Sequence, residues 1–156
     1  MALRKIRVDD DPILRKKSRP VERFDERLWE LLDDMKDTLL KANGLGLAAP
    51  QIGALRRVAV MNFEDGYLEL INPEILEAKG EQCVEEACLS LPHKAGVTKR
   101  PLSVKVRAQN RNGNWVLYEG SDLKARCFCH EIDHLDGKLY TDALAPGESV
   151  HYTEDY

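Results

Sequence analysis

Residues 127–134 read CFCHEIDH and include the side-chain types that bind metals. In a helix, residues four apart share one face, so His130 and His134 can point both imidazoles at one ion. Glu131 lies beside that pair, where it can take a proton from water. This H-E-x-x-H arrangement is typical of a hydrolytic metal site. The alternative is a solvated helix face that happens to carry two histidines.

A catalytic divalent site usually has three protein ligands, so a third is needed. The acidic residues and the histidine downstream do not have the spacing of the extended metzincin motif. Cys127 would have to share one helical turn with both histidines, and Cys129 points about a quarter turn away from His130. Cys88 can approach from a separate element. Geometry therefore favours Cys88, with an ordinary buried cysteine as the alternative.

Two helices are predicted to frame the chain. The first begins after Asp25, a suitable N-cap, and ends at Asn43-Gly44. Its apolar stripe consists of Leu28, Leu32, Met35, Leu39 and Ala42. The second spans about residues 121–135 and carries the two histidines, with Gly137 just past its end.

The segment between these helices is predicted to form strands. Candidate strands are residues 57–62, 67–73, about 75–86, 103–109 and 115–120. The run NRNGN is typical of a hairpin turn, and GLGLAAPQ follows a helix, which predicts a helix stop and a loop. The order predicts an α+β fold with antiparallel strands packed around a central metal-binding helix and one N-terminal amphipathic helix. Without repeats or an internal linker, residues 1–156 are predicted to form a single domain, with a surface strand or disorder after Pro146.

Composition narrows the functional classes. The 156 residues carry a net charge of −4, which argues against binding of nucleic acid through phosphate contacts. No apolar run approaches the roughly 18 residues of a membrane helix, and no signal peptide is evident. A cytoplasmic monomer is therefore expected. The four cysteines favour buried thiols or metal ligands over a disulfide framework.

Three motifs together resemble those of the peptide deformylases. A GxGxAAxQ loop matches Gly44–Gln51, an E-G-C-x-S segment matches Glu86–Ser90, and an H-E-x-x-D-H-type helix matches His130–His134. Each motif alone is weak or moderate. Their order and spacing match over nearly the whole chain, from about Asp11 to Leu144.

The resemblance implies a function and roles. The function is removal of the N-formyl group from the formyl-methionine of new polypeptides, with release of formate. Cys88, His130 and His134 would bind one divalent metal per chain, typically Fe²⁺ in this family, with Zn²⁺, Ni²⁺ or Co²⁺ also possible. Glu131 would be the general acid/base, Gln51 and the backbone N–H of Leu89 would hold the oxyanion, and the Gly46 backbone would pair with an extended peptide.

The chain departs from the family pattern at several positions. Ala87 replaces a glycine, which matters only if its φ is positive. Arg126 stands where an apolar residue more often lines the methionine pocket, and Ala95 stands where many members carry a peptide-steadying arginine, for which Lys94 is a possible substitute. Cys129 is interpreted as a packing residue. None of these changes removes a ligand or the base, so the chemistry is expected to be intact.

Three other interpretations remain open. One is a metallopeptidase of the general H-E-x-x-H type, which would not need Cys88. Another is an inactive deformylase-like peptide-binding protein, against which the retained ligands, Glu131 and Gln51 argue. The third is a redox or structural-metal protein built on Cys127 and Cys129, whose side chains would point roughly 200° apart on a helix.

Overall fold

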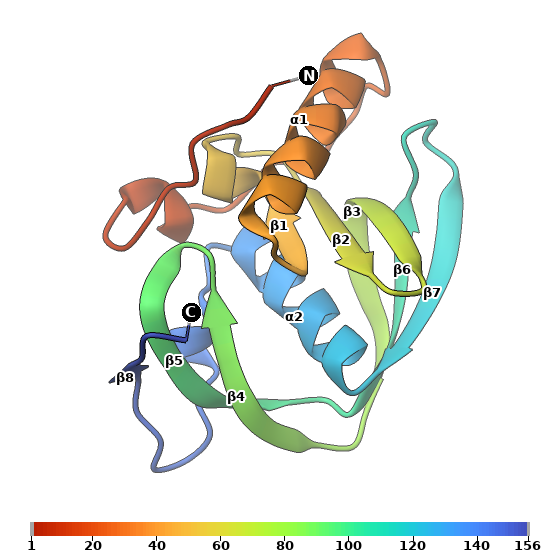
Figure 1. The fold of residues 1–156 in the computed structure, drawn as a ribbon. Coiled ribbons are helices and arrows are strands. Elements are labelled where there is room, and N and C mark those ends of the chain that lie inside the picture. The colour runs from red at the N-terminus through yellow and green to blue at the C-terminus, as the bar shows by residue number, and fades with distance from the viewer. Residues whose placement is uncertain (1, 156) are drawn as a thin grey trace.

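The computed structural model describes residues 2–155 (Figure 1). Its helices and strands, in chain order, are α1 (Glu26–Ala42), β1 (Gly46–Ala48), β2 (Val58–Phe63), β3 (Gly66–Lys79), β4 (Gln82–Cys88), β5 (Leu91–Arg100), β6 (Ser103–Gln109), β7 (Trp115–Ser121), α2 (Leu123–Leu135) and β8 (His151–Tyr152). Short 3-10 turns occupy η1 (Pro12–Arg15), η2 (Ala49–Ile52) and η3 (Tyr140–Asp142).

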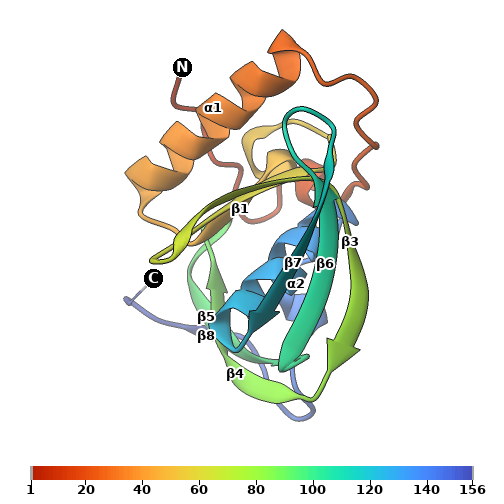
Figure 2. The same cartoon turned by 90° about the vertical axis from the view of Figure 1, so that its right-hand side faces the viewer.

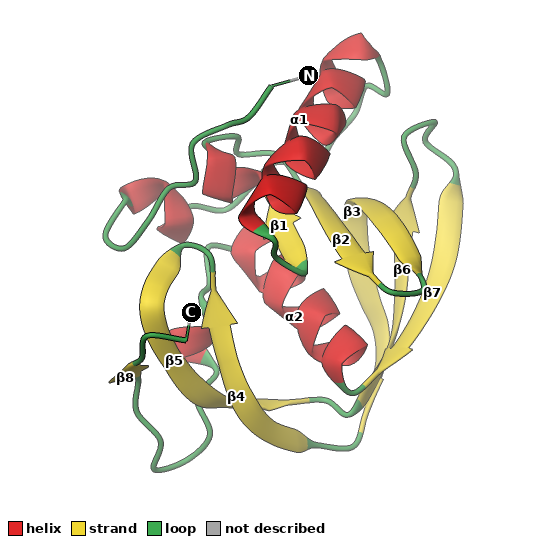
Figure 3. Ribbon diagram, in the orientation of Figure 1, coloured by secondary structure: helices red, strands yellow, loops and turns green. Residues whose placement is uncertain are grey.

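Two antiparallel sheets surround helix α2. One has the strand order β1-β2-β3-β6-β7, and the other has the order β4-β5-β8. In Figures 1 and 2, α2 runs between the two sheets, while α1 lies outside on the larger one. Figure 3 shows the same arrangement by secondary structure, with α2 enclosed by strands. The predicted α+β fold with a central helix is confirmed.

Helix α1 follows the predicted pattern. The Asp25 side chain accepts a hydrogen bond from the Leu28 amide at 3.3 Å, and Asn43 ends the helix in the left-handed conformation with φ +56°. The buried side chains of this stripe pack against β1 and β2 and form one core; they include Leu28, Leu32, Met35, Leu39, Leu47, Val58 and Val60.

The strands differ from the predicted ones in three places. Strand β3 continues through Pro73, because the ladder to β6 shifts register between Ile71 and Glu74 and so accommodates the proline. Strand β5 was not predicted, since its buried positions include the polar residues Thr98 and Arg100 and no apolar alternation marks it. The glycine loop contains a short strand, β1, in addition to a turn.

The C-terminal segment forms a surface strand, which is one of the two alternatives expected for it. In β8, His151 pairs with Ala95 of β5, and Tyr152 pairs with Lys94. Within residues 2–155, no helix has both the length and the apolar character needed to cross a membrane.

The end of α2 is closed by a tight contact with the N-terminal segment. Gly137 has φ +74°, and a Cβ there would lie 2.6 Å from the carbonyl oxygen of Arg15. The Ser18 amide donates to the Leu135 carbonyl at 2.8 Å, and the Arg57 guanidinium donates to the same carbonyl at 3.0 Å. Glycine is therefore required at position 137 for both its conformation and its small size.

We expect Gly137→Ala to be clearly more destabilising than Gly147→Ala. Gly147 has a similar φ of +81° but has nothing within 4 Å of the position of its Cβ. Gly147→Ala should therefore lower the free energy of unfolding by only about 1 kcal/mol, which is the cost of placing alanine in the left-handed conformation. Gly137→Ala should lose at least ~1 kcal/mol more, because the Arg15 backbone must move. Urea unfolding of both variants measures the difference, and equal losses would contradict the contact.

Candidate metal centre

Helix α2 presents both histidines to the interior. His130 is 9% exposed and His134 is 1% exposed, and their Nε2 atoms lie 3.2 Å apart. The opposite side of the helix is held by apolar packing of Ala125, Phe128 and Ile132 against the larger sheet. This packing fixes the rotation of α2, so the two imidazoles point away from that sheet.

Cys88 reaches the histidines from the end of β4. Its Sγ lies 3.3 Å from Nε2 of His134, and the three possible ligand atoms lie within 4.8 Å of one another. Tetrahedral zinc with usual bond lengths places two ligand nitrogens about 3.3 Å apart and a sulfur and a nitrogen about 3.6 Å apart. The three side chains therefore fit a tetrahedral divalent metal with one position left open.

The other helix cysteines are not part of this group. Cys129 is 5% exposed and packs in the core beneath α2, as the sequence interpretation expected, and burial raises its pKa to about 11. The Sγ of Cys127 lies against β1, 3.0 Å from the position that a Cβ on Gly46 would occupy. Burial raises the pKa of Cys127 as well. Both thiols are therefore held in the protonated form.

A buried carboxylate orients His130. Oε2 of Glu86 lies 2.6 Å from Nδ1 of His130, and Arg100 and Thr98 donate to the same carboxylate at 2.8 Å each. Burial alone would raise the pKa of Glu86, but the hydrogen bonds from His130 and Arg100 outweigh it and lower the pKa to about 2. Glu86 is therefore ionised, and it holds the His130 ring with Nε2 toward the other ligands.

Asp133 extends this network, and its part was not foreseen from the sequence. Nη1 of Arg100 lies 2.6 Å from Oδ2 of Asp133, so one guanidinium joins β4 to α2. The ion pair of Glu86 with Arg100 is therefore only half of the arrangement. Asp133 stands three residues after His130, and this spacing on one helix face was the available signal.

Glu131 lies next to the ligands and is almost fully buried, with 3% of its surface exposed. Burial raises its pKa to about 7. Its Oε1 has no hydrogen-bond partner within the described residues, and its Oε2 lies 2.5 Å from the position of a Cβ on Gly46. A carboxyl with this pKa and a free oxygen can both accept and donate a proton near neutral pH.

Gly46 belongs to an open sheet edge. Strand β1 is the last strand of its sheet and pairs only with β2 among the described strands. The close approach of Glu131 and Cys127 leaves no room for a side chain at position 46. The edge of β1 therefore runs directly beside Glu131.

Gln51 and Leu89 both adjoin Cys88. The Gln51 amide donates to Ser90 Oγ at 3.0 Å and to Cys88 Sγ at 3.6 Å, and its oxygen accepts from the Ala48 amide at 2.9 Å. Leu89 occupies the turn between β4 and β5, directly after Cys88. The structure therefore brings together the seven residues that were singled out from the sequence, namely Gly46, Gln51, Cys88, Leu89, His130, Glu131 and His134.

The departures from the family pattern have structural explanations. Positive φ at non-glycine residues among the described positions is limited to five, and Ala87 is not one of them. Alanine at position 87 is therefore free of backbone strain. Arg126 is partly buried and its Nη1 donates to Gln82 Oε1 at 2.9 Å, which ties α2 to the start of β4. Ala95 is fully buried.

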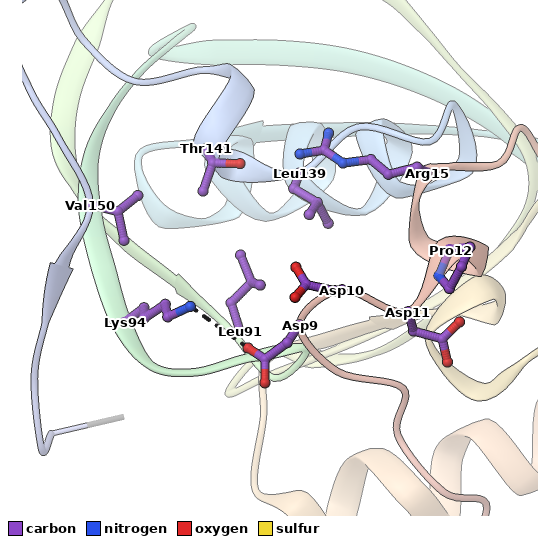
Figure 4. Close-up of a pocket in the computed structure, with 10 residues that line it drawn as sticks. All are labelled: Asp9, Asp10, Asp11, Pro12, Arg15, Leu91, Lys94, Leu139, Thr141 and Val150. Carbon is purple, nitrogen blue, oxygen red and sulfur yellow. Dashed lines mark ion pairs between the residues drawn. The ribbon is translucent and has the colours of Figure 1, made fainter.

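Lys94 points into a different pocket, of about 390 Å³ (Figure 4). There its Nζ lies 3.8 Å from Oδ1 of Asp9. The pocket is lined by Asp9, Asp10, Asp11, Pro12, Arg15, Leu91, Lys94, Leu139, Thr141 and Val150. None of the candidate ligands and neither Glu131 nor Gln51 lines it.

The fold and this donor set define a metal-dependent hydrolase, with two helix histidines, a strand cysteine and an adjacent buried glutamate. Comparison with known proteins agrees. The family model for polypeptide deformylase matches residues 3–150. A peptide deformylase of Alkaliphilus metalliredigens is 55% identical over 144 residues, covering 92% of this chain and 98% of that protein. One from Acetivibrio thermocellus is 57% identical, covering 92% and 85%.

Solved structures give the same result. A peptide deformylase of Thermotoga maritima matches with a TM-score of 0.91 at 41% identity, covering 94% of this chain and all of that one. The Synechococcus elongatus peptide deformylase in complex with actinonin matches with a TM-score of 0.87 at 35% identity, covering 91% and 79%. The chain belongs to the peptide deformylase family.

Replacing Glu86 by glutamine should destabilise the metal-free protein by about 3 kcal/mol at neutral pH, because breaking a buried ion pair typically costs about 3–5 kcal/mol. Asp133 still pairs with Arg100 and limits the loss. The depressed pKa of Glu86 means that its stabilisation is complete above the unfolded value of ~4.3 and is lost as pH falls toward about 2. The difference between wild type and variant should therefore shrink over that range.

Glu85→Gln is the matched control. Glu85 is the preceding residue of β4, and its ion pair with His151 is exposed. Its loss should cost less than ~1 kcal/mol. Urea unfolding followed by circular dichroism at several pH values measures both variants. A Glu86→Gln deficit that stays constant down to about pH 2 would contradict the assignment.

Proposed function

We propose that this chain hydrolyses the N-formyl group of the N-terminal formyl-methionine on newly made polypeptides. Water adds to the formyl carbon, the C–N bond breaks, and the products are formate and a free α-amino group. Membership of the peptide deformylase family supports this reaction. The observation that carries it is the buried Glu131, next to the cluster of Cys88, His130 and His134 and beside the open edge of β1.

Cys88, His130 and His134 are proposed to hold one divalent metal per chain. The distances between their ligand atoms fit tetrahedral coordination. A thiolate with two imidazoles suits Fe²⁺, which we propose as the metal in the cell, and also Zn²⁺, Ni²⁺ or Co²⁺. When bound, such an ion supplies Lewis acidity, which lowers the pKa of water and polarises a carbonyl group.

Glu131 is proposed as the general acid/base. Its pKa of about 7 lets it take the proton of the attacking water and deliver it to the leaving amine at neutral pH. The same burial that raises this pKa also limits exchange with bulk solvent. Glu131 is held beside the reacting atoms by its neighbours on α2 and by the close contact with β1.

Gln51 and the backbone N–H of Leu89 are proposed to hold the developing oxyanion. Both adjoin Cys88, and the Gln51 amide already points at its sulfur. The open edge of β1 at Gly46 is proposed to bind the peptide as an added strand. Because Glu131 lies against Gly46, a peptide paired with this edge would reach the carboxyl of Glu131.

The remaining properties are proposals of the same kind. The natural partners are N-formyl-methionyl peptides and nascent chains, whose synthesis places the protein in the cytoplasm. Residues 1–156 are proposed to act as a single-domain monomer without direct binding to nucleic acid or membranes. The net charge of −4 supports the first of these exclusions.

Glu131→Gln should abolish turnover and leave metal binding intact. We expect the protein, purified anaerobically and loaded with Fe²⁺ or Ni²⁺, to release formate from a formyl-Met-Ala-Ser peptide. Removing the base should lower kcat by at least ~10²-fold. Metal content, measured by elemental analysis, should stay at one ion per chain, since Glu131 is not a proposed ligand. Metal-loaded wild type without turnover, or a variant as active as wild type, would overturn the proposal.

Cys88→Ala tests the third ligand. Loss of its thiolate should abolish stoichiometric metal binding, because two histidines leave the site short of a ligand. Cys129→Ala is the control, since it removes a buried thiol of helix α2 that packs in the core. A Cys88→Ala protein that keeps its metal would favour the general H-E-x-x-H metallopeptidase, and metal loss in Cys129→Ala would favour a site built on Cys127 and Cys129.

A further inference from the structure

The two candidate histidine ligands are supported differently. A metal-binding histidine almost always donates its second ring N–H to a carboxylate, a carbonyl or a water. Nδ1 of His130 has such a partner in Glu86 at 2.6 Å. Nδ1 of His134 is buried and has no hydrogen-bond partner among the described residues. A buried donor left unpaired costs about 1–3 kcal/mol, so a partner is expected.

Besides Nδ1 of His134, the buried side-chain atoms without a partner among the described residues are Ser18 Oγ, Glu131 Oε1 and Tyr140 Oη. The Tyr140 ring stacks against His130, with ring centroids 6.3 Å apart, whereas Ser18 lies at the last turn of α2. The hydroxyl of Ser18 is also buried and unpaired among residues 2–155, and Ser18 is 3% exposed. Its own amide donates to the carbonyl of Leu135, the residue directly after His134. Ser18 therefore lies against the last turn of the helix that carries the histidine.

The N-terminal segment holds Ser18 in this place. Leu14 packs in one cluster with Cys88, and the Arg15 carbonyl lies against Gly137. Residues 14–18 thus run from the proposed cysteine ligand to the end of α2. His134 lies between these two points, because its Nε2 is 3.3 Å from Cys88 Sγ and Leu135 follows it in α2. The contacts at both ends of residues 14–18 therefore fix the position of Ser18 relative to His134.

We propose that Ser18 is a positioning residue for His134, joined to its Nδ1 through one buried water. The water accepts the Nδ1–H of His134 and donates to Ser18 Oγ, so two otherwise unpaired buried atoms are satisfied together. A proton held on Nδ1 leaves the lone pair of Nε2 for the metal. The inference rests on the proposed role of His134 as a ligand.

This arrangement makes the two histidines unequal donors. Glu86 is an ionised carboxylate and increases the basicity of His130. Ser18 and water are neutral and set the orientation of His134 with little effect on its charge. Ser18 therefore acts on geometry and affinity, and its loss should be visible in metal binding before it is visible in folding.

Ser18→Ala tests the inference through metal affinity. The dissociation constants of Zn²⁺ and Co²⁺ are measured by competition with a chelator, and the absorption spectrum of the Co²⁺ form reports ligand geometry. We expect Ser18→Ala to weaken binding by about 10-fold or more, the usual range for loss of such a partner. The Co²⁺ spectrum should change, while the Tm of the metal-free protein should fall only slightly, because a single neutral hydrogen bond to a water is lost.

Thr38→Val is the matched control. It also removes a buried hydroxyl, which accepts from the Arg4 amide at 3.0 Å on helix α1, away from the ligands. It should lower the Tm and leave metal affinity unchanged. Ser18→Thr keeps a hydroxyl and should restore most of the affinity that Ser18→Ala loses.

Two results would overturn the inference while leaving the proposed function intact. One is a Ser18→Ala protein with wild-type metal affinity and an unchanged Co²⁺ spectrum. The other is a high-resolution crystal structure of the metal-loaded protein in which Nδ1 of His134 bonds to a different group. A wild-type protein that binds no metal would instead overturn the proposed function and the inference with it.

Discussion

The buried carboxylate of Glu86 is the interaction on which the arrangement of the site depends. It lies on β4, accepts hydrogen bonds from Thr98 and Arg100 of β5, and contacts His130 on α2. An ionised carboxylate in the interior is costly unless it is fully hydrogen-bonded. Three elements must therefore be correctly placed at once for this charge to be tolerated. The same requirement brings the end of β4, which carries Cys88, to the face of α2.

A second constraint comes from the close approach of β1 to α2. Gly46 has no side chain, and the carboxylate of Glu131 occupies the space beside it. A sheet edge and the carboxyl proposed as the general acid/base are thus in contact, so a peptide that extended the sheet as proposed would reach Glu131 without further rearrangement. The low polarity created by this packing also raises the pKa of Glu131 to about 7. One contact therefore sets both the position of the sheet edge and the acid strength of Glu131.

The sequence predicted those parts of the molecule whose signals are local. The stripe of Leu28, Leu32 and Met35 predicted α1, and the pair of histidines four apart predicted the ligand face of α2. Three motifs in order predicted the family. Strand β5 was missed because Thr98 and Arg100 occupy buried positions where apolar residues would mark a strand. The buried polar residues of β5 bond to Glu86 on another strand. Hydrogen bonds between segments that are distant in the sequence produce no periodic pattern, so such a strand cannot be recognised from the sequence.

The same reason explains which site residues could not be foreseen. A ligand must be a histidine, cysteine or carboxylate, so its type narrows the search. A residue that supports a ligand can be any group with a suitable hydrogen bond, as Asp133 and Ser18 illustrate. Only the position of the backbone selects among the many candidates of each type, and that position is known only when distant segments are packed. The N-terminal segment shows this most clearly, since a serine surrounded by basic residues in the sequence lies, in the fold, against the helix turn of His134.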